Sequence, residues 1–202
     1  MANSRVCSLI VGSALALLAL VGASTAAATE NYSGATTLGA GTVTDFSLKS
    51  GTSASLTETG GSTLDTCTTS TVKMKKTNAG SSTTTVTAET TELTWGSCTF
   101  PTKTVTLGKV ETHHIAATTN GTATADAEIG VTINTVFFGS CVYGVSAGTD
   151  LGIGTGGNPA TFHANAVAKK LTGSAFACPE TAKFTATYTS TSPAGDLHTE
   201  AS

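Results

Sequence analysis

A four-residue phrase, an aromatic residue followed by Gly-Ser-Cys, occurs twice in this chain, at residues 95–98 and 138–141. Each copy ends a run of alternating residues, and another aromatic side chain follows it, Phe100 in the first case and Tyr143 in the second. Successive side chains of a β-strand point to opposite faces, so both copies are predicted to be strand ends that carry a core aromatic residue and a cysteine. The phrase therefore predicts a β fold that is held together by disulfide bonds.

Residues 1–28 have the three parts of a secretory signal peptide. Arg5 supplies the positive charge, residues 9–21 form an apolar core, and small residues at 23–28 form a peptidase site, with cleavage expected after Ala28. The apolar core is short for a membrane span, which needs about 20 residues. Cys7 falls within this segment and is expected to be removed with it. We therefore expect a secreted protein, extracellular or at the cell surface, with no membrane span in the mature chain.

Residues 29–202 are expected to form a single domain. This part of the chain is rich in Thr, which favours strands because its branched side chain suits a pleated, half-exposed surface. Charged residues make up only 11% of the sequence, and turn signals recur at the short intervals that are typical of β-sandwiches. The expected fold is all-β: an antiparallel β-sandwich, or flattened barrel, of about 10–12 short strands.

The charge balance argues against nucleic acid and anionic membranes as partners, because both require clustered cations. The ten basic residues include Arg5 in the leader, which leaves nine Lys against thirteen acidic residues. One local cluster of cations does occur, formed by Lys73, Lys75 and Lys76. We interpret it as an outer strand face whose lysines discourage edge-to-edge pairing.

The clearest strand signal lies at residues 181–189, where small and aromatic side chains alternate with Thr and Lys. A second alternation over residues 123–133 predicts one long strand, or two strands broken near Gly130. The Asn-Gly pair at 120–121 is a hairpin signal, so this strand is expected to pair with residues 111–118.

Other segments are predicted to be irregular. A shift of the alternation at residues 108–110 predicts a bulge or a bend between sheets. Residues 160–171 have a spacing that a short helix would also explain, although a helix is the less favoured interpretation. The Gly-rich segment Gly144–Pro159 is expected to be an extended loop or an irregular edge hairpin, and residues 29–34 are expected to be loose.

Four cysteines remain after the leader, and an exported chain is expected to pair them as two disulfides. Three pairings are possible. The repeated phrase favours the sequential one, Cys67 with Cys98 and Cys141 with Cys178, and each bond is expected to stabilise the fold by about 3–4 kcal/mol. A zinc site is not expected because the chain has no Cys-x-x-Cys spacing, and nothing in the sequence indicates another metal or a cofactor.

The histidines do not form a catalytic or metal-binding pattern. His113 and His114 are adjacent, so on a strand their side chains point to opposite faces and cannot bind one ion together. We expect one solvated and one packed imidazole. His163 and His198 lie far away in sequence, without the spacing of metal ligands.

Two other motifs also favour structural interpretations. The glycine-rich residues 152–157 resemble a phosphate-binding loop, but no strand-then-helix context surrounds them, so a flexible surface loop is the favoured interpretation. Asp126 and Glu128 share a strand face, as a pair of catalytic carboxylates would, but they fall on the polar side of a regular alternation. We expect both carboxylates to be solvated.

Several cysteine-centred segments carry a family resemblance, namely residues 67–72, 93–98, 136–144, 177–180 and 185–188. In these segments the chain resembles small secreted bacterial proteins of unknown function that share the aromatic-Gly-Ser-Cys phrase. The resemblance implies export and a disulfide-bonded β fold. It implies no activity and no site residues.

Three functional hypotheses follow from these observations. The leading one is a non-enzymatic extracellular module with a structural, adhesive or recognition role, because Thr-rich strand faces suit contacts with polysaccharide, cell-surface matrix or other copies of the chain. The second is a secreted hydrolase or inhibitor whose site lies in the loop Gly144–Pro159, near His163. The third is a pilin-like subunit that a neighbour's strand completes.

Overall fold

A computed structural model describes residues 29–81 and 83–201 of the protein. The expected signal peptide, with Cys7, lies outside the described residues. The described chain is built entirely from strands and their connections. The strands are β1 (Glu30–Ser33), β2 (Thr36–Thr37), β3 (Val43–Leu48), β4 (Ala54–Glu58), β5 (Thr63–Lys76), β6 (Val86–Cys98), β7 (Thr102–Thr106), β8 (Lys109–His114), β9 (Gly121–Ala125), β10 (Ile129–Thr135), β11 (Gly139–Val145), β12 (Asp150–Thr155), β13 (Thr161–Lys170), β14 (Thr181–Ser192) and β15 (Leu197–Glu200).

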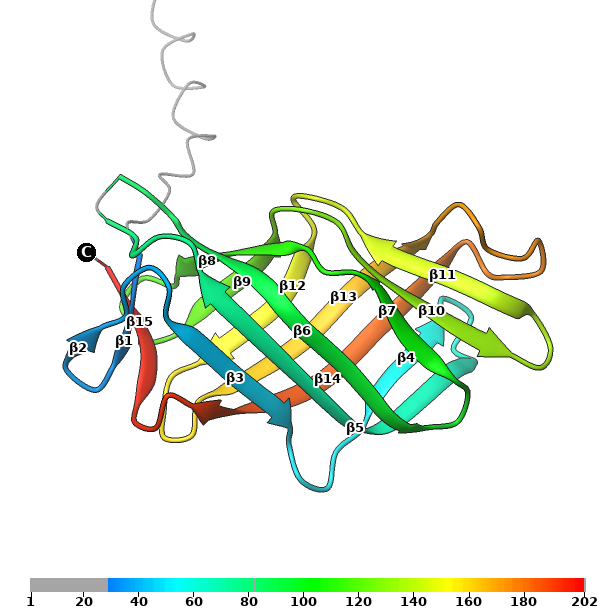
Figure 1. Ribbon diagram of the computed structural model, residues 1–202, viewed down its shortest axis with the longest axis horizontal. Coiled ribbons are helices and arrows are strands. Elements are labelled where there is room, and N and C mark those ends of the chain that lie inside the picture. Colours follow the sequence, from blue (N-terminus) through cyan, green and yellow to red (C-terminus); the bar gives the residue numbers. More distant parts are fainter. Residues whose placement is uncertain (1–28, 82, 202) are drawn as a thin grey trace, which may run out of the picture.

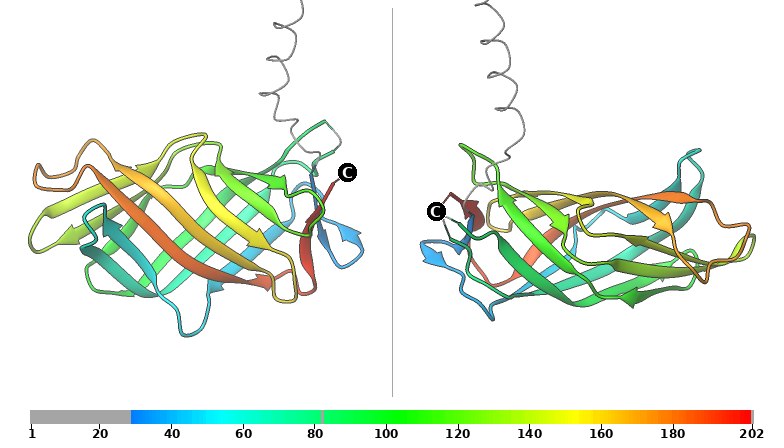
Figure 2. Two further views of the ribbon diagram at one scale, coloured as in Figure 1. Left: turned by 180° about the vertical axis from the view of Figure 1, so that it is seen from behind. Right: turned by 90° about the horizontal axis from the view of Figure 1, so that it is seen from above.

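Eight of these strands form a closed antiparallel barrel. The ring runs β5–β6–β8–β9–β12–β13–β14–β3, and β3 pairs back to β5 to close it. The barrel is flattened, so that the layer containing β3, β5 and β6 faces the layer containing β12, β13 and β14 (Figures 1 and 2). This confirms the expected all-β fold in its flattened-barrel form, although β5, β6, β13 and β14 are longer than expected, with 10 to 14 residues each.

The remaining strands extend the barrel at its two ends. At one end β4 pairs with β14 and β5, and β11, β10 and β7 continue the sheet from β13. At the other end the small sheet β15–β1–β2 joins the two termini of the described chain. Figure 1 shows this small sheet and the β10–β11 hairpin at opposite ends of the long axis.

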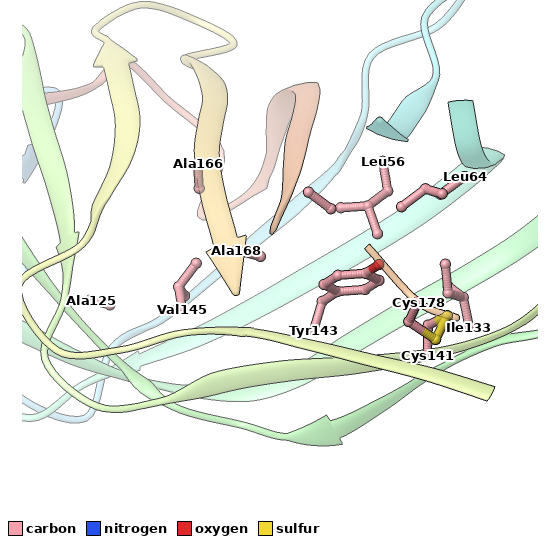
Figure 3. Close-up of a cluster of buried hydrophobic side chains, with 11 residues drawn as sticks. Leu56, Leu64, Ala125, Ile133, Cys141, Tyr143, Val145, Ala166, Ala168 and Cys178 are labelled. Atoms are coloured by element: carbon pink, nitrogen blue, oxygen red, sulfur yellow. A yellow bond between two sulfur atoms is a disulfide. The ribbon is translucent and has the colours of Figure 1, made fainter. Parts of the chain in front are cut away.

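Alternation explains why these segments form half-buried strands. In β14, Ala182, Ala186 and Tyr188 are buried, while Lys183 between them is exposed. The buried side chains of the β10–β11 end surround Tyr143, which is fully buried beside Leu56 (Figure 3). Tyr143 follows the second copy of the repeated phrase, and its place in the core agrees with the prediction, but this copy begins β11 and does not end a strand.

Both disulfides have the favoured pairing. Cys67 on β5 is bonded to Cys98 on the neighbouring β6, and the two residues are direct register partners. Cys141 on β11 is bonded to Cys178 in the β13–β14 connection, with a Cα–Cα distance of 5.7 Å (Figure 3). Each bond therefore joins a copy of the repeated phrase to a segment that lies beside it in space.

The structure differs from the prediction in the Gly-rich segment Gly144–Pro159 and in residues 29–34. Residues 150–155 form β12, which pairs with β9 and β13 and is an interior strand of the ring, so the prediction of a loop or edge hairpin for Gly144–Pro159 was wrong. The absence of a side chain at Gly152 allows this, because a Cβ there would overlap the backbone of His163 on β13. Residues 29–34 are not loose either, since β1 pairs with β15 along its whole length.

The structure also tests three predictions about local secondary structure. Residues 161–170 form β13 and not a helix. The alternation over residues 123–133 belongs to two strands, which was one of the two predicted alternatives, and the break falls at residues 126–128 between β9 and β10. The pairing of β8 with β9 is confirmed, but residues 115–120 connect them, so the link is longer than a two-residue hairpin turn.

The irregularity at residues 108–110 is a bend at which the chain changes strand partners within one sheet. β7 pairs with β10 on one side of the molecule, and β8, which starts at Lys109, pairs with β6 and β9. A Cβ at Gly108 would lie 2.5 Å from the carbonyl oxygen of Glu128, so the chain crosses here at a residue without a side chain.

The lysine cluster does not lie on an edge strand. β5 is paired on both sides, with β3 and β6 along the segment that carries the lysines. Lys73 forms an ion pair with Glu92, 2.8 Å between Nζ and Oε2, on the outer face. Lys76, in contrast, is only 2% exposed. The prediction of three solvated lysines was therefore wrong for Lys76.

Candidate ligand-binding cavity

A cavity of about 270 Å³, partly open to solvent, lies between the two layers of the barrel. Protein interiors are normally packed with few voids larger than a water molecule. An engineered cavity of about 150 Å³ with an apolar lining is already large enough to bind benzene. A void of this size is therefore a candidate binding site, near the lower end of the range for small molecules.

One wall of the cavity is built from small residues. The inward positions of β13 carry Ala164, Ala166 and Ala168, while Asn165 and Val167 between them point outward and are exposed. The neighbouring strands continue this pattern with Gly121 and Ala123 on β9 and Gly154 on β12. Because these side chains are short, the wall leaves space that larger residues would have filled.

The facing wall is lined by larger apolar side chains. They are Phe46 on β3, Val72 and Met74 on β5, and Leu93 and Trp95 on β6. Trp95 meets Phe184 of β14 edge to face, with 5.5 Å between ring centroids. The layer of β12, β13 and β14 also contributes larger side chains to the lining, among them Phe162 and Phe184. The cavity thus has aromatic side chains on both layers, with a patch of alanine and glycine on one of them.

The polar atoms of the aromatic residues that line the cavity form hydrogen bonds with other residues of the protein. Trp95 donates its Nε1 hydrogen to Thr104 Oγ1 at 3.0 Å, and Tyr143 donates its hydroxyl hydrogen to the Pro179 carbonyl at 3.0 Å. Tyr188 and Ser70 share a hydrogen bond of 3.0 Å between their hydroxyls. Burial raises the pKa of both Tyr143 and Tyr188 to about 12. These phenols stay neutral in ordinary conditions.

The small sheet β15–β1–β2 covers one end of the cavity. Tyr32 on β1 stacks on His198 of β15, with ring centroids 5.4 Å apart and planes 10° apart, and both residues line the cavity. His198 Nε2 lies 3.2 Å from Glu200 Oε1. Among the described residues that line the cavity, none is Asp, Glu, Lys or Arg. The interior is therefore suited to an uncharged or largely apolar molecule.

The structure separates the histidines that the sequence analysis considered. His113 lies near Glu111 and Thr124, with its Nε2 3.2 Å from Thr124 Oγ1. His114 has a buried Nδ1, which agrees with the prediction of one solvated and one packed imidazole. His163 is exposed, with its Nδ1 3.1 Å from Thr187 Oγ1 on the outer face of β14. His198 is the histidine that reaches the cavity, and its sequence position gave no indication of this.

The candidate carboxylates and glycines likewise form no reactive group. Asp126 and Glu128 are exposed in the connection between β9 and β10, as expected for solvated side chains. Residues 152–157 belong largely to β12, so they are part of the barrel wall and not a flexible loop.

Asp65 lies beside the sulfurs of Cys67 and Cys98, which is an arrangement that a metal ion could use if the sulfurs were thiolates. The two sulfurs are bonded to each other, however. The Asp65 carboxylate instead accepts hydrogen bonds from the backbone N–H groups of Thr66 and Phe100 and from the Thr102 hydroxyl. Its role is to hold the β6–β7 connection against β5.

A second feature is an apolar tip at the opposite end from the small sheet. It consists of Val136 and Phe137 in the β10–β11 turn and Phe176 in the β13–β14 connection, which are 77%, 83% and 100% exposed. The two loops are fixed to each other by the Cys141–Cys178 disulfide and by the hydrogen bond from Ala175 N–H to the Ser140 carbonyl, 2.8 Å long. Exposed apolar side chains held in a rigid group often mark an interaction surface.

Sequence reasoning missed the cavity, although a signal for it was present. The alternation over residues 164–168 and 121–125 places alanine or glycine at successive inward positions. Those residues keep a strand pattern but supply little volume, so an interior that they line is not completely filled.

Comparisons with family models, with curated proteins and with solved structures find no match for this chain. Within residues 29–81 and 83–201, the fold contains no helix with the length and apolar character needed to cross a membrane.

Proposed function

We propose that this protein is an exported, non-enzymatic recognition protein that binds a small apolar molecule inside its barrel. The observation that carries the proposal is the cavity of about 270 Å³, which is lined mainly by aromatic, aliphatic and small side chains. An apolar ligand gains free energy by leaving water, at about 25 cal/mol for each Å² of apolar surface that it buries. The protein side of the site is already formed, which keeps the entropic cost of binding low.

Export is part of the same proposal. Two disulfides join segments 31 and 37 residues apart in the sequence. Such bonds persist in oxidising compartments and are rare in the cytosol. Together with the expected leader at residues 1–28, they support a secreted protein. The resemblance to secreted bacterial proteins points in the same direction and stays a prediction.

Trp95 offers a direct test of ligand binding. It is the single tryptophan of the chain and it lines the cavity. Titrating the purified secreted chain with octane should change Trp95 fluorescence in a saturable way. The ligand would fill the space beside the indole and so change the surroundings of its ring. A fluorescence signal that does not change, at ligand concentrations up to the solubility limit, argues against an apolar binding site.

The apolar tip supports a second candidate function, attachment to a lipid surface. Val136, Phe137 and Phe176 project from loops, and residues 129–149 and 171–179 contain no charged side chain. An uncharged tip on an acidic protein fits an uncharged lipid surface better than an anionic one, which attracts clustered cations. This function is compatible with the first, since apolar ligands concentrate in lipid.

The other hypotheses receive less support from the geometry. A hydrolase site near His163 is not favoured, because this side chain lies on the outer face, away from the cavity. A pilin-like subunit needs a vacant strand position, whereas the eight-stranded ring of the described chain closes on itself through β3 and β5. Contacts with polysaccharide or matrix through the Thr-rich outer faces are weakened where hydroxyls pair with each other, as in Thr71 and Thr94 at 2.5 Å.

A further inference from the structure

The two strands that carry much of the cavity wall become polar at the same end of the barrel. On β5 the inward residues Val72 and Met74 line the cavity, and the next inward position is Lys76. On β8 the inward residues Val110 and Thr112 line it, and the next inward position is His114. Both strands reach the end that the small sheet β15–β1–β2 covers (Figure 1).

Lys76 is the unusual member of this group. Its side chain is buried, and its ammonium donates a hydrogen bond of 2.5 Å to the main-chain carbonyl of Leu38, a residue that itself lines the cavity. No ion pair formed by the described residues includes Lys76. The acidic group that influences it is Glu30, whose carboxylate accepts a hydrogen bond from the Tyr32 hydroxyl at 2.7 Å.

A buried ammonium without a carboxylate partner is rare, because removing a charge from water is costly unless an opposite charge compensates it. Burial lowers the pKa of Lys76 to about 8, so the group is still mainly charged at neutral pH. Two further polar atoms of this end, Asn31 Oδ1 and His114 Nδ1, are buried without a hydrogen-bond partner. Lys76 itself does not line the cavity, but its hydrogen-bond partner Leu38 does, so the ammonium lies one residue behind the wall of the apolar cavity. Asn31 Oδ1 is an acceptor and would need a donor, so it does not contribute to binding an anion.

We propose that the ligand is a small amphiphile with a carboxylate head, whose hydrocarbon chain occupies the apolar cavity and whose head pairs with the ammonium of Lys76. This inference rests on the proposed function of the cavity and specifies its ligand class. The volume of about 270 Å³ exceeds that of a cavity of about 150 Å³ that binds benzene, which has six carbons. A fatty acid of about eight carbons is therefore a suitable ligand to test.

The test compares three ligands of equal chain length, namely octanoate, octanol and octane, with Trp95 fluorescence as the readout. At neutral pH the native protein should bind octanoate at least tenfold more tightly than octanol, because a charge-assisted hydrogen bond is stronger than a neutral one. Octylammonium, which has the same chain and the opposite charge, should bind more weakly than octanol. This ligand series requires no variant and so does not depend on any variant's folding.

A pair of variants then locates the effect. Lys76→Met keeps the length of the side chain and removes the charge, and Lys75→Met makes the same change at the exposed neighbouring position. Lys76→Met should weaken octanoate binding about tenfold or more and leave octane binding unchanged, whereas Lys75→Met should change neither.

The outcomes separate the two proposals. If octane and octanol bind but octanoate binds no more tightly than octanol, or if Lys76→Met leaves octanoate binding unchanged, the carboxylate inference is overturned and the apolar site survives. If none of the three ligands binds, the proposed function fails and this inference fails with it.

Discussion

The hydroxyl of Tyr188 on β14 meets the hydroxyl of Ser70 on β5 at 3.0 Å, and each residue is 97% buried. The two strands are not direct neighbours, because β3 lies between them in the eight-stranded ring and β4 lies between them at the end of the barrel. This contact therefore ties strands that the sheet itself does not join directly.

Removing one partner of this hydrogen bond should leave the other unsatisfied in the core. Tyr188→Phe should lower the free energy of unfolding by about 1–2 kcal/mol, since a buried polar group without a partner loses its hydration without compensation. Urea unfolding of Tyr188→Phe, Ser70→Ala and the double variant provides a double-mutant cycle. If the double variant loses the sum of the two single effects, the hydroxyls do not interact.

Stability should depend on pH through Lys76. Its pKa is about 8 in the folded chain and near 10.5 when it is exposed. Between these values the unfolded chain holds the proton and the folded chain does not, so the free energy of unfolding rises with pH. After allowance for solvent screening, the gain should be about 1–2 kcal/mol between pH 8 and pH 10. Lys76→Met should abolish this rise in urea titrations at several pH values, and Lys75→Met should retain it.

The two disulfides should contribute similarly to stability, because they close loops of similar length. Replacing Cys141 and Cys178 together by Ala should cost about 3–4 kcal/mol on the chain-entropy model. The same replacement of Cys67 and Cys98 should cost a comparable amount. Thermal unfolding of both double variants under oxidising conditions measures this, and a loss below about 1 kcal/mol in either variant contradicts the expected contribution of that bond.

The apolar tip should determine binding to uncharged lipid. Co-sedimentation with phosphatidylcholine vesicles should fall at least fivefold in the double variant Phe137→Ser with Phe176→Ser, because a buried aromatic side chain contributes about 1.5–3 kcal/mol. Ile153→Ser and Val167→Ser, which also replace exposed apolar residues but lie on the barrel wall, serve as the matched control. Equal sedimentation of both double variants, or concentration-dependent dimers that the tip variant abolishes, would assign the tip another role.

Local patterns predicted much of the fold because they report on local structure. The alternation in β14 and the repeated phrase around Cys98 and Cys141 specify strands whose inward residues can be read directly. The closure of the ring depends instead on the pairings of β3 with β5 and of β9 with β12. Those pairings follow from the fit of whole sheet faces, which single-strand patterns do not determine.

The candidate site was harder to predict because it arises from interior volume that small side chains leave unfilled. The alanines at 164, 166 and 168 look like ordinary strand positions, and only the fold shows that they line the same cavity as Gly121 and Ala123. That relationship depends on which strands become neighbours, which the sequence alone does not provide. Lys76 was predicted to be solvated because it belongs to a cluster of lysines, although strand parity places it inside with Val72 and Met74.

The measurement that tests the account most directly is the affinity for octane of Ala166→Leu against that of Val167→Leu. Ala166 lines the cavity, and its replacement by Leu adds three carbon atoms that take up part of this space. Val167 is on the outer face of the same strand, where Leu adds no volume to the interior. The account predicts that Ala166→Leu binds octane at least tenfold more weakly than the native protein and that Val167→Leu binds it equally well. Equal octane affinity in both variants would mean that ligand does not occupy the barrel interior.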